Sequence, residues 1–157
     1  MVYIFDTNTL SNIFKYYYTS SFLSFWERFN TLVEIREVLS VREVKNELDA
    51  TKWSSDINDW LKGNRDIFEK PSEIELDFIR DIYFIRHFQN NIRRKSIYQG
   101  KPVADPFVIS KARINGGTVV TEEEFKPNAA EIPNICAHFD VDCVNLEGFL
   151  TIQGWVF

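Results

Sequence analysis

Two groups of carboxylates stand directly after short apolar segments that have the composition of buried strands. Asp6 follows residues 2–5, and three consecutive glutamates at 122–124 follow residues 118–121. In an open parallel sheet, ligands bind beyond the carboxyl ends of the strands, so we expect both groups at one edge. Each group alone also has an ordinary explanation, since Asp6 could cap a helix and the glutamates could form an exposed turn.

Two further acids, Asp105 and Glu47, belong to helices that are expected next to these strands. Asp105 precedes Pro106, which opens a helix that ends at the glycine pair 116–117. Glu47 lies one to two turns into the helix that follows a strand candidate at 38–39. Taken singly, Asp105 is an equally good helix cap and Glu47 an ordinary solvated side chain. The functional interpretation therefore depends on the joint placement of the acids.

Dispersed carboxylates that meet at one edge of a sheet suit metal-assisted hydrolysis of a phosphodiester bond. Mg²⁺ binds oxygen ligands and keeps several waters, so a few carboxylates suffice to hold it. Such a site needs neither histidine nor cysteine, and this chain has two of each. Cys136 and Cys143 lack the spacing of a zinc site, and we expect both to be ordinary buried thiols.

The composition indicates one folded domain over residues 1–157. Hydrophobic residues make up 45% of the chain, and 14 phenylalanines supply ample bulk for a core. The net charge of −5 argues mildly against a protein that coats nucleic acid, although a local basic rim can coexist with an acidic centre. No signal peptide and no membrane-spanning stretch is recognisable, so the expected location is the cytoplasm and no membrane partner is expected.

Hydrophobic periodicity predicts short strands that alternate with helices. The expected strands are 2–5, 38–39, 118–121 and 141–144, and the expected helices are 9–15, 20–32, 40–50, 54–61, 73–88, 106–115, 133–139 and 145–150. Ser40 is a candidate cap for the third helix, and the polar, basic stretch 90–100 is expected to be a loop. This alternation is typical of a parallel sheet that is covered on both faces.

Four motifs in order make the whole chain resemble the PIN-domain family. They are Asp6-Thr7-Asn8 after the first strand, Glu47-Leu48 at the end of 41–48, Ala104-Asp105-Pro106 at the start of a helix, and Thr121-Glu122-Glu123 after an apolar strand. The tail at 126–136 also resembles an uncharacterised PIN-like subfamily. The resemblance implies a three-layer α/β/α fold with a central, mostly parallel sheet of four to five strands.

The resemblance also implies an activity, a cofactor and partners. VapC-like members of the family are Mg²⁺- or Mn²⁺-dependent endoribonucleases, the toxins of type II toxin–antitoxin pairs. By analogy, RNA would be the substrate, an antitoxin protein would be the partner, and a homodimer is a common state. A catalytically inactive PIN-fold module that binds an antitoxin or regulator is the main alternative.

The site residues implied by the resemblance follow the four motifs. The expected catalytic and metal-binding residues are Asp6, Glu47, Asp105 and Glu123, and the residues expected to hold these carboxylates by hydrogen bonds are Thr7, Asn8 and Thr121. The fourth acid is commonly Asp in the family, and Phe125 comes one residue earlier than usual. Which of Glu122, Glu123 and Glu124 faces the metal is therefore open, and Glu123 is our expectation.

The densest basic cluster, Arg93, Arg94 and Lys95, is the candidate for contacts with RNA phosphates, with Tyr98 stacking on a base. A solvated loop without a function is the alternative for this cluster. Two other enzyme classes fit less well. A haloacid-dehalogenase-like phosphatase needs a second Asp where this chain has Asn8, and a flap nuclease needs an arch or clamp for which the chain is short.

Overall fold

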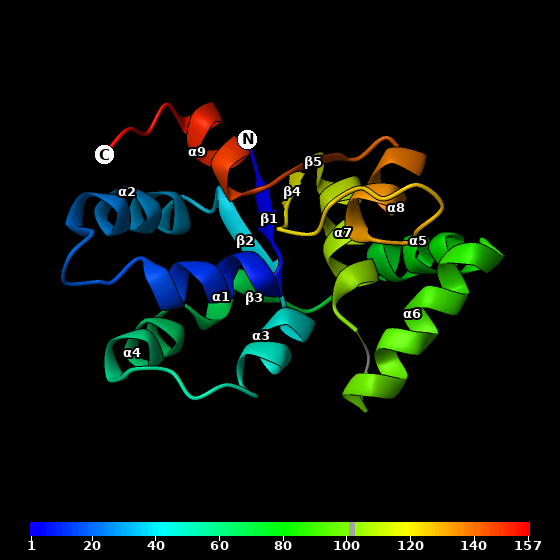
Figure 1. The fold of residues 1–157 in the computed structure, drawn as a ribbon, viewed down its shortest axis with the longest axis horizontal. Coiled ribbons are helices and arrows are strands. Elements are labelled where there is room, and N and C mark those ends of the chain that lie inside the picture. The colour runs from blue at the N-terminus through cyan, green and yellow to red at the C-terminus, as the bar shows by residue number, and fades with distance from the viewer. Residues whose placement is uncertain (101–102) are drawn as a thin grey trace.

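The centre of the protein is a sheet of five strands that all run parallel. The computed structural model describes residues 1–100 and 103–157, apart from the side chains of Asn91, Tyr98 and Gln99. The strand order is β3-β2-β1-β4-β5 (Figure 1). The strands are β1 (Tyr3–Phe5), β2 (Val38–Val41), β3 (Phe68–Glu69), β4 (Thr118–Val120) and β5 (Asp142–Val144). The expected fold class is confirmed, with β3 as a strand that the sequence analysis had not identified.

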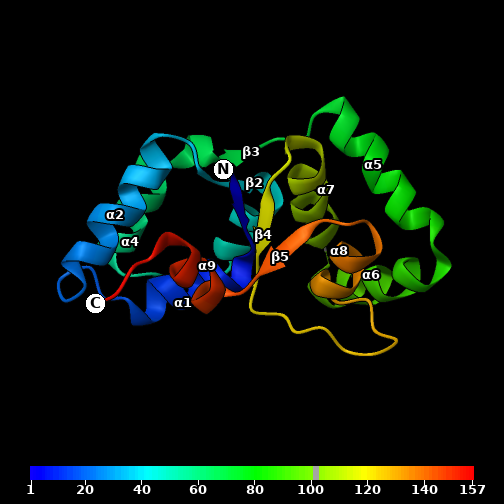
Figure 2. The ribbon, with the colours of Figure 1, turned by 90° about the horizontal axis from the view of Figure 1, so that it is seen from above.

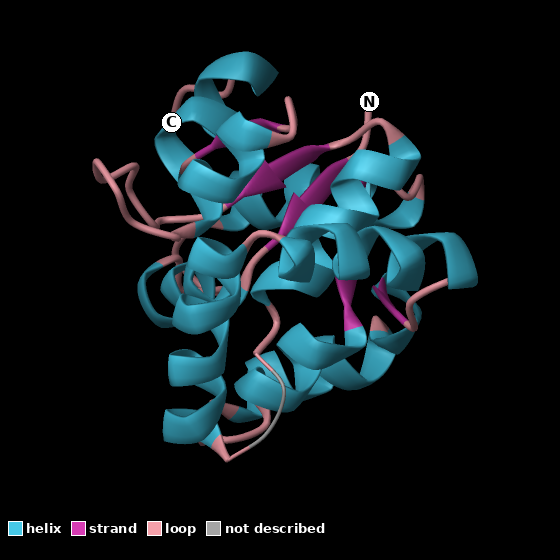
Figure 3. Ribbon diagram, turned by 90° about the vertical axis from the view of Figure 1, so that its right-hand side faces the viewer, coloured by secondary structure: helices cyan, strands magenta, loops and turns pink. Residues whose placement is uncertain are grey.

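Helices cover both faces of the sheet and make the fold three-layered. Helices α1, α2, α4 and α9 lie on one side, and α5, α6, α7 and α8 lie on the other (Figure 2). The bounds are α1 (Thr7–Tyr16), α2 (Leu23–Glu34), α3 (Arg42–Leu48), α4 (Ser55–Gly63), α5 (Glu73–Phe84), α6 (Arg86–Gln99), α7 (Asp105–Asn115), α8 (Ile132–His138) and α9 (Leu146–Gln153), with a 3₁₀ turn at Arg65–Ile67. Figure 3 shows how the helices enclose the short strands.

The strands are apolar because both of their faces are buried. Ile4 in β1 is paired with Leu39 on one side and Val119 on the other, and none of the three is more than 8% exposed. Such all-apolar strands are characteristic of a sheet that helices cover twice. This double cover fixes the register of β1 and β4, and so fixes where their carboxyl ends lie.

Aromatic rings fill much of the core beside β1. The Phe5 ring lies 5.5 Å from that of Phe29 in α2 and 5.1 Å from that of Phe149 in α9, both edge to face. Phe25 and Phe29 stack at 5.4 Å. These geometries stabilise ring pairs beyond the area that they bury. The phenylalanine-rich helix α2 is therefore part of the core, as the sequence predicts.

Three local predictions are wrong. The stretch 90–100 is not a loop but the second half of α6, which ends at Gly100 in the left-handed conformation at φ +67°. Its sequence is polar, but Ile92 and the earlier Phe88 are buried on one helix face. The expected helix 73–88 is interrupted at Ile85, whose backbone is extended. Ser40 does not cap α3, because it lies inside β2 and its hydroxyl donates to the Phe5 carbonyl at 2.7 Å.

None of the helices within residues 1–100 and 103–157 is both long and apolar enough to cross a membrane.

Candidate functional site

Asp6 stands at the carboxyl end of β1, held between that strand and β4. Its amide donates to the Val120 carbonyl at 2.9 Å, and its carboxylate accepts from the Thr121 hydroxyl at 3.0 Å. The side chain makes no capping hydrogen bond to α1 and is only 4% exposed. A capping role therefore does not explain why a carboxylate is buried at this position.

Asp105 approaches the same point from the start of α7. It is the first residue of the helix, and Ala104 holds the capping position, so the sequence-based explanation of Asp105 as a cap is wrong. The Asp105 residue is 7% exposed, and its Oδ2 accepts a hydrogen bond from the Lys95 ammonium at 2.7 Å. The carboxylate is thus directed towards other side chains and not along its own helix.

The three consecutive glutamates after β4 have separate roles. Glu122 accepts a hydrogen bond from the Leu146 amide at 2.9 Å and so holds the start of α9, while Glu124 is exposed to solvent. Glu123 alone reaches the neighbourhood of Asp105, since its Oε1 accepts from Lys95 at 2.8 Å. Its other oxygen, Oε2, is buried and has no hydrogen-bond partner among the described residues. The structure therefore brings Glu123, and not its two neighbours, into the acidic cluster.

Glu47 joins the cluster from α3 and is fixed at both oxygens. Its Oε1 accepts from the Thr7 hydroxyl at 2.5 Å, and its Oε2 accepts from the Ala104 amide at 3.1 Å. The second bond ties α3 to the residue that precedes Asp105. Glu47 is therefore not a solvated side chain, and its position is set by the motif residues around it.

Asn8 and Thr121 connect the ends of β1 and β4. The Asn8 Oδ1 accepts from the Glu122 amide at 3.0 Å and from the Thr121 hydroxyl at 3.3 Å. The Thr121 Oγ1 in turn accepts from the Glu123 amide at 3.2 Å. Asn8 and Thr121 belong to two motifs that lie 113 positions apart, and together they hold the loop that carries Glu123 against Asp6.

A single cavity of about 550 Å³ receives all four acids. It is lined by Asp6, Thr7, Asn8, Ser11, Asn12, Lys15, Glu47, Lys95, Val103, Asp105 and Glu123. These residues come from both faces of the sheet and from the ends of two strands. The convergence that the sequence analysis required is therefore present in the structure.

Two members of the cluster have positions that the sequence did not reveal. Lys95 was expected to contact RNA, yet its ammonium lies between Asp105 and Glu123 and 3.6 Å from Glu131. Glu131, a fifth acid, was not identified, because it stands in an irregular segment and belongs to none of the motifs. Only its contacts with Lys95 and Glu123 associate it with the site.

Burial and mutual repulsion shift the ionisation of the two innermost acids. Burial and the charge of Asp105 raise the pKa of Asp6 to about 7, against the opposing hydrogen bonds from Thr7 and Thr121. Burial, the charge of Asp105 and the neighbouring Glu131 carboxylate raise the pKa of Glu123 to about 9. Although burial opposes its charge, Lys95 has a raised pKa because Asp105 and Glu123 stabilise the ammonium. Without a cation, simultaneous ionisation of these acids is therefore unfavourable, because burial and mutual repulsion oppose their negative charges.

The donors suit a hard divalent cation such as Mg²⁺ or Mn²⁺. All are carboxylate oxygens, one of them the partnerless Oε2 of Glu123, and the Lys95 ammonium already places a positive charge between two of them. As the side chains stand, no three acidic, histidine or cysteine groups within the described ranges converge closely enough to enclose a metal ion. Lys95 and a metal ion are thus alternatives for the same carboxylates.

The remaining residues of the predicted basic cluster lie outside this cavity. Arg93 and Arg94 are exposed on α6, and neither forms a salt bridge with another residue that the structure describes. The side chain of Tyr98 lies outside the described residues. Lys95 is therefore the member of the cluster that contacts the acids directly.

Sequence comparison assigns the family. The family model described as "Domain of unknown function (DUF4411)" matches residues 3–157, and the chain belongs to this family. No curated protein matches the sequence.

Comparison with solved structures supports the fold. The crystal structure of VapBC2 from Rickettsia felis, bound to a DNA fragment from the promoter, contains a chain that is similar to this one with a TM-score of 0.50. The similarity covers 92% of this chain and 98% of that chain at 15% sequence identity. At this identity the likeness shows the fold alone, which is PIN-like.

Proposed function

We propose that the chain, acting as one domain over residues 1–157, is a Mg²⁺- or Mn²⁺-dependent endoribonuclease and the toxin of a type II toxin–antitoxin pair. One observation carries the proposal: acids from four separate motifs line one cavity at the carboxyl ends of β1 and β4. The PIN-like fold supports it, since this fold is shared by a chain of the VapBC2 structure, which is bound to a DNA fragment from its promoter.

Asp6, Asp105 and Glu123, with Glu47 beside them, would hold the cation. A divalent ion at such a site activates water for attack and neutralises the charge that develops on the scissile phosphate. Thr121 and Asn8 hold Asp6 and the loop of Glu123 in place, and Thr7 holds Glu47. Lys95 would be displaced from the carboxylates by the ion and would then be free to contact a phosphate of the RNA.

Purified protein incubated with single-stranded and hairpin RNAs in Mg²⁺, Mn²⁺ or EDTA tests this activity. We expect cleavage that EDTA abolishes and that Asp105→Asn reduces by more than about 100-fold, beyond the loss typical of residues that only orient metal ligands. Asp142→Asn is the matched control, because Asp142 is exposed at the start of β5, away from the cavity. Wild-type cleavage by Asp105→Asn would contradict the assignment of the site.

Expression in a bacterial host tests the biological role. We expect the wild-type chain, produced without a partner, to arrest growth, and Asp6→Asn at matched protein levels to relieve the arrest. An antitoxin encoded beside it and a homodimer belong to the same proposal. Unimpaired growth with both forms, together with no RNA cleavage, would favour the non-catalytic binding module. The contact of Lys95 with two of the acids is the observation that keeps this alternative in view.

A further inference from the structure

Two further hollows lie along α6, and Lys95 lines both the first of them and the acidic cavity. The first, of about 500 Å³, shares Lys95 with the acidic cavity and is also lined by Arg94 and Asn128. The second, of about 510 Å³, shares His87 and Asn128 with the first and extends to Phe125. These two neighbouring hollows, which lie between α6, residues 125–131 and part of α8, are together called the α6 groove.

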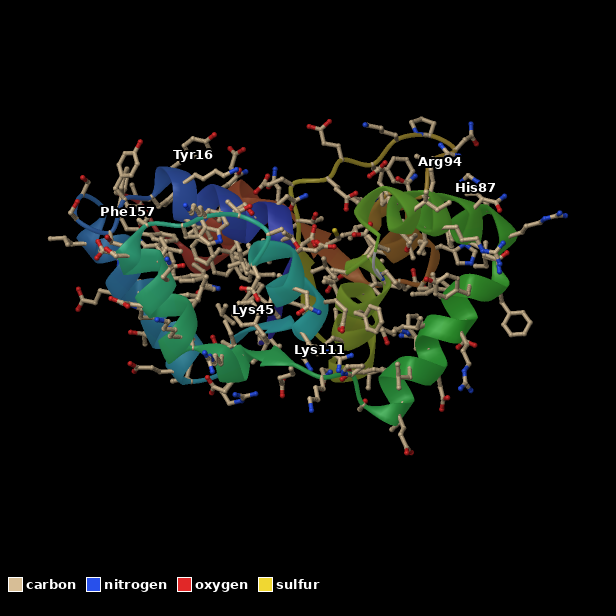
Figure 4. The ribbon with its side chains drawn as sticks, turned by 90° about the horizontal axis from the view of Figure 1, so that it is seen from below. Tyr16, Lys45, His87, Arg94, Lys111 and Phe157 are labelled. Atoms are coloured by element: carbon tan, nitrogen blue, oxygen red, sulfur yellow. The ribbon has the colours of Figure 1, made fainter. Side chains whose placement is uncertain are left out.

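The wall that α6 contributes to this groove carries the exposed guanidinium of Arg94 and the exposed imidazole of His87. Arg94 and His87 are seven residues apart, about two helical turns, and therefore project from one face of α6. Figure 4 shows both side chains at the edge of α6 beside the loop that follows β4. Both are exposed, and Arg94 makes no salt bridge within the described part of the chain. This guanidinium is free to bind a phosphate.

The opposite wall carries an exposed aromatic ring. Phe125 is 60% exposed and makes no contact with another ring among the described residues, unlike the nearby pair of Phe88 and His138 at 5.5 Å. An exposed phenyl ring that lines the groove has the chemistry of a platform on which an unpaired base can stack. Asn128, at φ +62°, turns the backbone of the same loop towards α6.

We infer that the α6 groove binds a single strand of RNA and leads it to the carboxylates. Arg94 contacts a backbone phosphate, Phe125 stacks on a base, and Lys95, at the junction of the two cavities, lies nearest the bond to be cut. The inference rests on the proposed nuclease function and adds the form of the substrate. A paired duplex does not suit the groove, because its bases have no free face for Phe125.

Fluorescence anisotropy of labelled oligonucleotides in EDTA, where no strand is cut, measures this binding without requiring activity. We expect Phe125→Ala to weaken binding of single-stranded RNA by about 5- to 100-fold. Arg94→Gln should weaken it and also reduce the slope of log K against log salt by about 0.7, the value for one phosphate contact on a single strand. A blunt-ended duplex of equal length should bind more weakly and should not respond to Phe125→Ala.

Two exposed residues elsewhere provide matched controls. Phe84 is 87% exposed, and Arg86 is on α6 itself but lines a different hollow together with Phe84. Phe84→Ala and Arg86→Gln should leave RNA binding unchanged. If they weaken binding as much as Phe125→Ala and Arg94→Gln do, contact is not confined to the α6 groove and the inference is wrong.

The outcomes separate this inference from the proposed function. In one outcome, cleavage depends on metal and on Asp105, but Phe125→Ala and Arg94→Gln bind RNA as tightly as the wild type. This result would contradict RNA binding in the α6 groove and would still support the proposed nuclease function. Binding that depends on Phe125, without cleavage in any metal, would support the groove and overturn the nuclease. Equally tight, Phe125-dependent binding of single-stranded DNA would overturn the choice of RNA. Variants that lose an antitoxin but keep RNA would show that the groove holds a protein instead.

Discussion

Two lysines in this protein lie between carboxylates, and their surroundings differ in charge balance. Lys111 in α7 is enclosed, with 5% of its side chain exposed, 3.0 Å from Glu69 and 3.6 Å from Glu75. Arg36 also contacts Glu69 at 3.1 Å, so two cations face the two carboxylates that Lys111 contacts, and the further acid that Arg36 reaches, Asp66, is 77% exposed. Lys95 in α6 is 31% exposed and is the only cation of the acidic cavity in contact with Asp105 and Glu123 among the described residues.

The two clusters therefore differ in how many cations face their carboxylates. Buried charges are normally paired, because an unpaired one costs several kcal/mol of desolvation, and the Lys111 cluster follows that rule. Glu131 adds a third acid in contact with Lys95, and Asp6 and Glu47 also line the acidic cavity, where Lys15 is the other cation among the described lining residues. The surplus of negative charge is a cost to the isolated chain that a divalent cation from solution would remove.

The largest effect on stability is expected at the Lys111 cluster. Lys111→Met would leave Glu75, which is 5% exposed, without its main cation, and removal of one partner from a buried pair costs about 3–5 kcal/mol. Denaturant unfolding should give the same loss in EDTA and in Mn²⁺, because no metal is expected there. If Mn²⁺ reverses this loss of stability, the Lys111 cluster also responds to metal and does not differ from the acidic cavity in this property.

At the acidic cavity, in contrast, stability should depend on metal. Lys95→Met should destabilise the protein less than Lys111→Met in EDTA, because the site is more exposed and its acids can retain protons. It should gain more from Mn²⁺ than the wild type does, since no ammonium competes. At 100-fold over its dissociation constant the metal would add about 2.7 kcal/mol. An equal gain in stability from Mn²⁺ in wild type and Lys95→Met would show that Lys95 and the metal do not compete for the same carboxylates.

The hydrogen bonds that hold the carboxylates should have smaller effects. Thr121→Val keeps the shape but removes the hydroxyl that donates to Asp6 and accepts from Glu123. We expect about 10- to 100-fold weaker Mn²⁺ binding, as for other residues that orient metal ligands. Calorimetric titration measures it, and Thr151→Val, which alters an exposed hydroxyl in α9, is the control. Wild-type affinity in Thr121→Val would remove Thr121 from the site.

How much of this could be read from the sequence depended on the range of the interactions. Asp6, Asp105 and the glutamates at 122–124 are predictable because strand ends and helix starts leave local patterns, and the order of the parallel elements brings such ends together, whereas Glu47 and the choice of Glu123 depend on the resemblance to the PIN-domain family. Nothing local indicated that Lys95 would insert between two acids, since its contacts with Asp105 and Glu123 span 10 and 28 positions.

The errors in secondary structure have the same origin. The second half of α6 has few apolar residues, so its periodicity was weak, and packing of Phe88 and Ile92 determined the helix. Strand β3 has two residues and exists through its register with Ser40 and Val41 in β2. Neither element could be inferred without knowing what it packs against.

A further expected effect is a dependence of stability on pH in EDTA. A carboxyl group whose pKa is raised in the folded state stabilises the fold while it is protonated, and this contribution disappears as the pH rises through the folded value. With Asp6 at about 7 and Glu123 at about 9, stability should fall from about pH 5 to pH 9. Asp6→Asn should flatten the part between pH 5 and 7. If the stability of the wild type and of Asp6→Asn depends on pH in the same way, the pKa of Asp6 is not raised in the folded protein.

Direct titration of Mn²⁺, followed by electron paramagnetic resonance of the free ion, tests the central claim that the acidic cavity is a metal site. The wild type and Asp142→Asn should bind the ion equally, Lys95→Met should bind it more tightly, and Asp105→Asn should lose most of the binding. Lys111→Met, if it remains folded, should bind as the wild type does. A wild-type protein that leaves Mn²⁺ free, or an Asp105→Asn protein that binds it with unchanged affinity, would contradict the account.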